Sequence, residues 1–161
     1  MTSPPPFVVF IDFDGVTHPL RDRSPKRLDD PLMGVEWFCP DNVGQVNRLL
    51  RNLNSVGVIS SAWRLDFPWS AFQRYFNGRL VGQTPELSGW HRLAECQLFL
   101  TQRGWESASW VAIDDKPTLY SPDATLIIPD YRRGLVAADV DAFLNRARHP
   151  SRIVHPIPQV N

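Results

Sequence analysis

The chain has 161 residues, of which 43% are hydrophobic and 21% charged, so it has the composition of a globular protein and enough length to bury its own core. Lys and Arg together number 17, as do Asp and Glu, and this zero net charge argues against a dedicated binder of duplex nucleic acid. The two cysteines, Cys39 and Cys96, lack metal-ligand spacing. The start MTSPPPF lacks the basic region of a secretory signal, and no apolar run is long enough to span a bilayer. We therefore expect a cytoplasmic protein without membrane contact.

The first expected element is a strand at residues 7–11, because this uninterrupted apolar run is typical of a strand covered on both faces in a parallel sheet. Two carboxylates one residue apart, Asp12 and Asp14, follow the strand directly. Carboxylates are costly to bury unless they are paired or hold a metal ion. We expect a single domain with its core at about residues 7–148, followed by a proline-rich tail at residues 149–161.

Residues 17–40 lack clear periodicity and hold several prolines and aspartates, so we expect a long loop or a small flap there. Asp41 is a candidate N-cap for the next element, a helix with apolar residues at helical spacing as far as Leu53. Residues 58–59 then predict a short strand that ends in two serines.

The alternation of helices and strands continues through the middle of the chain. Residues 69–76 predict a short aromatic helix, and residues 79–81 predict a brief strand. Ser88 is a candidate N-cap for a further helix, which should stop at Gly104.

The last third of the chain predicts two more strands and a final helix. Residues 110–113 form a buried strand that ends in paired acids, residues 124–128 form the next strand, and residues 137–148 form an amphipathic helix. Strands that alternate with helices imply right-handed crossovers. We therefore expect an α/β protein with three layers, a Rossmann-like fold around a central parallel sheet.

Polar side chains stand at the ends of three predicted strands: Asp12 with Asp14, Ser60 with Ser61, and Asp114 with Asp115. The carboxyl ends of parallel strands share one edge of the sheet, where ligands bind in open α/β folds. Several carboxylates at one point repel each other unless a cation joins them, and oxygen ligands with phosphate chemistry suit Mg²⁺. The alternative is that each pair is only a turn signal or a helix cap, and the three matching positions favour the metal site.

These motifs resemble a known family. The segment DFDGVT at residues 12–17 resembles the first motif of the haloacid dehalogenase (HAD) superfamily in its phosphatase form. VISSAWR at residues 58–64 resembles the second motif, and VAIDD at residues 111–115 resembles the fourth. With a late Gly134-Leu135 stretch, the combination is most similar to the small HAD domains of bacterial RNA-repair proteins of the Swiss Army knife type. The resemblance implies the HAD fold with a minimal cap or none.

The resemblance also implies roles for the acidic residues. Asp12 would be the nucleophile that forms an aspartyl-phosphate, a known role for carboxylates. Asp14 would protonate the leaving oxygen and then activate water. Mg²⁺ would be bound by Asp12, by the main-chain carbonyl of Asp14, and by Asp114 and Asp115.

Two further roles are implied, each with an alternative. Ser60 would hydrogen-bond a phosphoryl oxygen, and Ser61, one position along, is its rival. For the cation that steadies the phosphoryl group, Arg92 is the first candidate because of its place near the start of the predicted helix, and Lys116 is the second. Further candidates for contact with substrate are Arg64 and His18.

The predicted function is that of a Mg²⁺-dependent phosphomonoesterase acting through an aspartyl-phosphate. A site with little cover fits a bulky substrate such as a nucleic-acid end, and a nucleotide or another phosphorylated small molecule is the alternative. Two other classes stay open. A metal-dependent nuclease could gather acidic residues at strand ends, and a catalytically weak binding or adaptor module could use the same fold.

Overall fold

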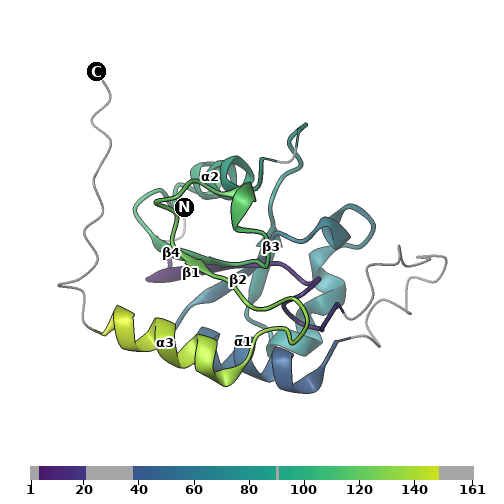
Figure 1. The fold of residues 1–161 in the computed structure, drawn as a ribbon. Coiled ribbons are helices and arrows are strands. Elements are labelled where there is room, and N and C mark those ends of the chain that lie inside the picture. Colours follow the sequence, from purple (N-terminus) through teal and green to yellow (C-terminus); the bar gives the residue numbers. More distant parts are fainter. Residues whose placement is uncertain (1–3, 21–37, 90, 149–161) are drawn as a thin grey trace.

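The computed structural model describes residues 4–20, 38–89 and 91–148. Five parallel strands form one sheet in the order β3-β2-β1-β4-β5. They are β1 (Phe7–Ile11), β2 (Val56–Ile59), β3 (Leu80–Gln83), β4 (Ser109–Ile113) and β5 (Leu126–Ile127). Helices α1 (Pro40–Asn52) and α3 (Ala137–Ala147) lie together on one side of the sheet, and α2 (Arg92–Arg103) lies on the other (Figure 1). The predicted three-layer, Rossmann-like α/β fold is confirmed.

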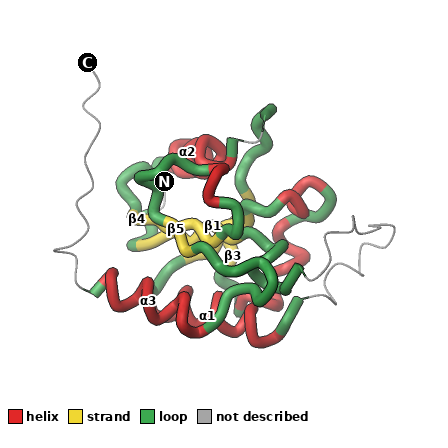
Figure 2. Tube along the Cα trace, in the orientation of Figure 1, coloured by secondary structure: helices red, strands yellow, loops and turns green. Residues whose placement is uncertain are grey.

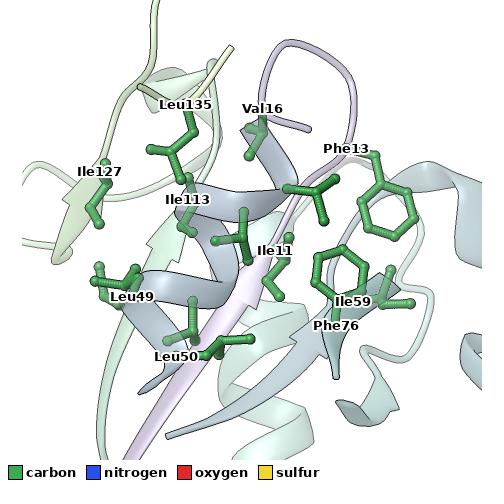
Figure 3. Packing of buried hydrophobic residues seen from close by; sticks show 14 of the residues in the cluster. Ile11, Phe13, Val16, Leu49, Leu50, Ile59, Phe76, Ile113, Ile127 and Leu135 are labelled. Atoms are coloured by element: carbon green, nitrogen blue, oxygen red, sulfur yellow. The ribbon is translucent and has the colours of Figure 1, made fainter. Parts of the chain in front are cut away.

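The apolar run of β1 is buried on both of its faces. Successive residues of a strand point to opposite sides, so Ile11 packs toward α1 and Phe10 packs toward α2. Figure 3 shows Ile11 beside Leu49 and Leu50 of α1. On the other face Phe10 meets the ring of Phe99 edge-on, with centroids 6.1 Å apart. Each such side chain stabilises the fold by roughly 1.5–3 kcal/mol through burial, which fixes β1 at the centre of the three layers (Figure 2).

Both helix caps predicted from the sequence are wrong. Helix α1 begins at Pro40, with Cys39 as its N-cap, and Asp41 lies inside the first turn. The fixed φ of proline suits the first helical position, so the helix starts two residues earlier than expected. Helix α2 begins at Arg92 and not after Ser88, because Gly89 has a φ of 91°, which a right-handed helix does not allow.

Smaller differences concern the edges of the sheet. Strand β3 extends to Gln83, and β5 is limited to Leu126–Ile127, since Ile128 is 51% exposed. Residues 69–76 form a short 3-10 helix, η3 (Trp69–Phe76), and its Phe72 and Phe76 belong to the core. Figure 3 shows Phe76 in this cluster.

Two predicted segments are not tested by the structure. Residues 21–37 of the predicted flap, and the tail at residues 149–161, lie outside the described part of the chain. Within the described ranges, every helix is too short or too polar to cross a membrane.

Candidate active site

The register of the sheet brings three strand ends together. Ile11 of β1 is paired with Ile59 of β2 on one side and with Ile113 of β4 on the other. The ladder continues one step further, because the N–H of Asp12 donates to the carbonyl of Ile113 at 3.0 Å and the N–H of Ser60 donates to the carbonyl of Ile11 at 3.0 Å. Residues that follow these strands therefore lie at one edge of the sheet.

Three aspartates form a cluster at this edge. Asp12, Asp114 and Asp115 each present an oxygen within 4.8 Å of the other two. Asp12 is 5% exposed and Asp114 is fully buried. Burial raises the pKa of all three carboxyl groups, and the charge of Asp12 contributes to raising the pKa of Asp114 to about 7. When all three carboxyl groups are ionised and no cation is bound, their negative charges repel each other.

Arg92 faces this cluster from the first position of α2. Its Nη1 lies 3.5 Å from Oδ1 of Asp12 and 3.8 Å from Oδ2 of Asp114, and it donates to the carbonyl of Ser60. The positive charge of the guanidinium group opposes the effect of burial, so the pKa of both aspartates rises less than burial alone would raise it. Lys116, the second candidate for this cation, is exposed; its main-chain N–H donates to Asp114 Oδ1 at 2.9 Å.

Negative charge exceeds positive charge around the cluster. Besides the three aspartates, the buried Glu95 pairs with Arg64 at 2.8 Å, so four carboxylates meet two guanidinium groups. Oδ1 of Asp115 is buried and has no hydrogen-bond partner in the described part of the chain. An all-oxygen donor set with more carboxyl groups than guanidinium groups fits a hard divalent cation such as Mg²⁺, and the residues present therefore suit this metal.

The turn after Asp14 requires a glycine at position 15. This residue has a φ of 74°, in the left-handed region that favours glycine. A Cβ atom here would lie 2.9 Å from Cγ of Asp115 and 3.0 Å from Cβ of Tyr131. The chain can therefore turn away from the strand end, directly beside Asp115, only where the side chain is absent.

Asp14 is oriented differently from the three clustered carboxylates. Its Oδ2 accepts a hydrogen bond from the indole Nε1–H of Trp63 at 3.1 Å, and its Oδ1 lies 2.9 Å from Nε2 of His18. About a third of the Asp14 side chain is exposed, whereas His18 is 2% exposed. The structure thus places His18, a predicted substrate contact, against Asp14 within the protein.

Of the two serines, Ser61 is the one whose side chain interacts with Asp12. A hydrogen bond from the Ser61 side chain helps to lower the pKa of Asp12. Ser61 is also the N-cap of the short 3-10 helix η2 (Ala62–Leu65), since its Oγ accepts from the N–H of Trp63 at 3.4 Å. The Ser60 hydroxyl is buried without a partner among the described residues. Both serines thus lie at the end of β2, and the interaction with Asp12 makes Ser61 the first choice for the proposal below.

Arg64 is held by the protein itself. Its Nε donates to the carbonyl of Thr84 at 3.0 Å, and its Nη1 donates to the carbonyls of Ser60 and Ser61 at 2.9 Å each. Its Nη2 is paired with Glu95, and only 6% of the residue is exposed. The side chain therefore stabilises the main chain at the end of β2. These contacts give Arg64 a supporting role for the serines, and the residue also lines the pocket that adjoins Arg92.

Sequence reasoning missed two functional neighbours of the site. Trp63 lies in the second motif, but nothing in its spacing indicated that its N–H would reach Asp14, 49 positions away. Tyr120 donates its hydroxyl to Asp114 Oδ2 at 3.0 Å from just beyond the short helix η4 (Pro117–Leu119). Both contacts depend on the path of a loop, which periodicity does not predict.

A pocket of about 200 Å³ adjoins Arg92. Its walls come from η2, from the loop after β3, from the start of α2 and from η4, and they include Leu65, Leu87 and Leu119. A larger cavity of about 500 Å³ lies at the starts of β1 and β4, around Phe7 and Ser109, and contains none of the site residues. The pocket beside Arg92 is therefore the smaller of the two.

A parallel sheet with aspartates just after β1 and β4, and an arginine from α2 beside them, fits the Rossmann-like HAD fold. Residues 8–140 match the family model described as the HAD domain in Swiss Army Knife RNA repair proteins, and the chain belongs to this family. No curated protein and no solved structure matched the chain.

Proposed function

We propose that the protein is a Mg²⁺-dependent phosphomonoesterase that forms an aspartyl-phosphate on Asp12. The observation that carries this proposal is the grouping of Asp12, Asp114 and Asp115 within 4.8 Å, with the Arg92 guanidinium 3.5 Å from Asp12. The three aspartates would hold Mg²⁺, which supplies positive charge to offset the charge of the transferring phosphoryl group.

The chain's own residues account for the chemical steps. An oxygen of Asp12 attacks phosphorus, the bond from phosphorus to the leaving oxygen breaks, and Asp14 gives its proton to that oxygen. Asp14 then takes a proton from water as the water attacks the phosphorus of the aspartyl-phosphate, which releases inorganic phosphate and restores Asp12. Arg92 and Ser61 bind phosphoryl oxygens, a form of electrostatic stabilisation worth roughly 3–4 kcal/mol for one good donor.

Nucleic-acid ends are the proposed substrate class. The pocket beside Arg92 measures about 200 Å³, whereas sites that enclose small molecules usually measure roughly 300–1,000 Å³. Most of the substrate would therefore lie outside the pocket, as the end of a polymer does. The family's occurrence in RNA repair proteins supports the same choice.

Two exposed arginines stand next to the site and suit a polyanionic substrate. Arg132 and Arg133 follow Tyr131, whose carbonyl accepts from the N–H of Leu20 at 2.7 Å. Tyr131 in turn lies beside Gly15 of the first motif. Arginine recognises phosphate through charge-assisted hydrogen bonds, so this loop could contact a phosphate next to the one that is removed.

The proposal is tested by hydrolysis of an aryl phosphate, with and without chelator. We expect activity that requires Mg²⁺ and is abolished in Asp12→Asn, and mass spectrometry should detect a phosphoryl group on Asp12 in the wild type. Oligonucleotides with a 3′- or 5′-phosphate should then be better substrates than the matching mononucleotides. Full activity in metal-free buffer, or cleavage of internal phosphodiesters without an adduct on Asp12, would contradict the proposal and favour a nuclease.

A further inference from the structure

The carboxyl group of Asp14 is held at both of its oxygens. The indole N–H of Trp63 reaches Oδ2 at 3.1 Å, and Nε2 of His18 lies 2.9 Å from Oδ1. An indole nitrogen can only donate, so its bond to Oδ2 has one possible direction. Two fixed partners on one carboxyl group restrict its rotation about both side-chain bonds.

The two partners are themselves immobilised by packing. Trp63 is 5% exposed and meets the ring of Phe13 edge-on, with centroids 5.6 Å apart. The ring of His18 lies 6.2 Å from that of Phe38 and 5.6 Å from that of Trp63. Rigid aromatic rings of this kind lose little further freedom when they make a hydrogen bond, so they can orient a mobile carboxyl group.

The first motif forms a hydrogen-bonded turn next to the Asp14 carboxyl group. The N–H of Gly15 donates to the carbonyl of His18 at 3.1 Å, and the hydroxyl of Thr17 donates to the carbonyl of Phe13 at 3.0 Å. This tight turn returns His18 to Asp14, four residues earlier in the chain. Trp63 arrives from the second motif, so the two motifs meet at one carboxyl group.

We propose that Trp63 and His18 are positioning residues that fix Asp14 in the orientation in which it exchanges a proton with the leaving group. The inference rests on the proposed function, because it concerns the acid–base step of that reaction. Neither residue contacts the phosphoryl group in this role. A general acid must lie within hydrogen-bond reach of the oxygen that it protonates, and a displacement of about 1 Å can reduce the rate by roughly a hundredfold.

The decisive variant is Trp63→Phe, which keeps an aromatic ring in the core and removes the N–H donor together with part of the ring volume. Its matched control is Trp69→Phe, because Trp69 packs against the same core cluster and the hydrogen bond it makes to Gln83 uses its main-chain N–H. A second variant, His18→Phe, removes Nε2 and keeps a ring beside Phe38. Circular dichroism and thermal melting verify folding of all three proteins.

The readout is the dependence of the rate on the leaving group. With an activated aryl phosphate, whose leaving oxygen needs no proton, Trp63→Phe should lose only about twofold to threefold. With an alkyl or nucleoside phosphate the loss should be about tenfold to a hundredfold, since protonation by Asp14 contributes roughly 10²–10⁴ to such reactions. Trp69→Phe should match the wild type on every substrate. A merely structural role would reduce all substrates equally.

A double-mutant cycle gives an independent test. In the Asp14→Asn background, Trp63→Phe should have no further effect on the leaving-group dependence, because the group that it positions is no longer an acid. Additive losses, or equal losses with good and poor leaving groups, would overturn the positioning role while leaving the phosphatase intact. Absence of hydrolysis by the wild type would instead refute the proposed function, and the positioning role with it.

Discussion

Replacing Asp114 by Asn should stabilise the metal-free protein at pH 8 and not at pH 4. The fully buried carboxyl group of Asp114 has a pKa of about 7, raised from 3.8 by burial and by the charge of Asp12. Between these two values the folded state binds a proton that the unfolded state has lost. The stability that this group contributes is therefore complete below about pH 4 and decreases as the pH rises through 7.

The magnitude follows from the same two values. A difference of about three pH units between 3.8 and 7 corresponds to roughly 4 kcal/mol, at about 1.4 kcal/mol for each unit. Asn is a close substitute, because its amide oxygen can still accept from the N–H of Lys116 while the Tyr120 hydroxyl turns to accept from the amide. The variant should thus lose the pH dependence without losing the packing.

Urea denaturation in the presence of EDTA, repeated from pH 4 to pH 8, measures the effect. The free energy of unfolding of the wild type should decrease relative to that of Asp114→Asn by about 2–4 kcal/mol across this range. At pH 8, Mg²⁺ should raise the stability of the wild type more than that of the variant. An identical pH dependence in both proteins, or equal stabilisation by Mg²⁺, would refute the reasoning.

Three other substitutions have definite expected outcomes. Gly15→Ala should destabilise the protein by roughly 1–3 kcal/mol in thermal unfolding, because the residue has positive φ and its Cβ would lie 2.9 Å from the Asp115 carboxyl group; wild-type stability would show that the turn can adjust. Ser61→Ala should reduce turnover by roughly a hundredfold and Ser60→Ala by far less, and the reverse order in steady-state kinetics would restore Ser60 as the phosphoryl-binding serine. Arg64→Met should cost up to roughly 3–5 kcal/mol in urea denaturation, because it removes the closest cation of the buried Glu95 carboxylate, and a loss of substrate affinity at unchanged stability would contradict its role as a support.

The parts of the fold that depend on periodic burial could be predicted from the sequence. Strand β1 has the predicted bounds, because every residue from Val8 to Ile11 is fully buried and the apolar run is uninterrupted. Helix α2 ends at the predicted Gly104, whose φ of 66° suits a helix end. The predicted aspartates of β1 and β4 lie together, because parallel strands in adjacent positions end at the same edge.

The parts that depend on loop paths could not be predicted. The helix caps at Asp41 and Ser88 were wrong because proline and glycine geometry at neighbouring positions decided where each helix begins. The choice between Ser60 and Ser61 depended on how the chain turns after β2, where the pattern of alternation ends. Arg64 resembled a free cation in the sequence, and only the structure reveals the main-chain carbonyls that surround it.

The central place of β1 determines which parts of the site can move. Its main chain is bonded to β2 on one side and to β4 on the other, and the N–H of Asp12 extends that ladder to Ile113. Amide hydrogens at such a position exchange with solvent only when the whole domain unfolds, whereas a two-residue edge strand such as β5 can open locally. The backbone of Asp12, the proposed nucleophile, is therefore as stable as the protein itself, and the motions that the proposed reaction needs must come from the surrounding loops.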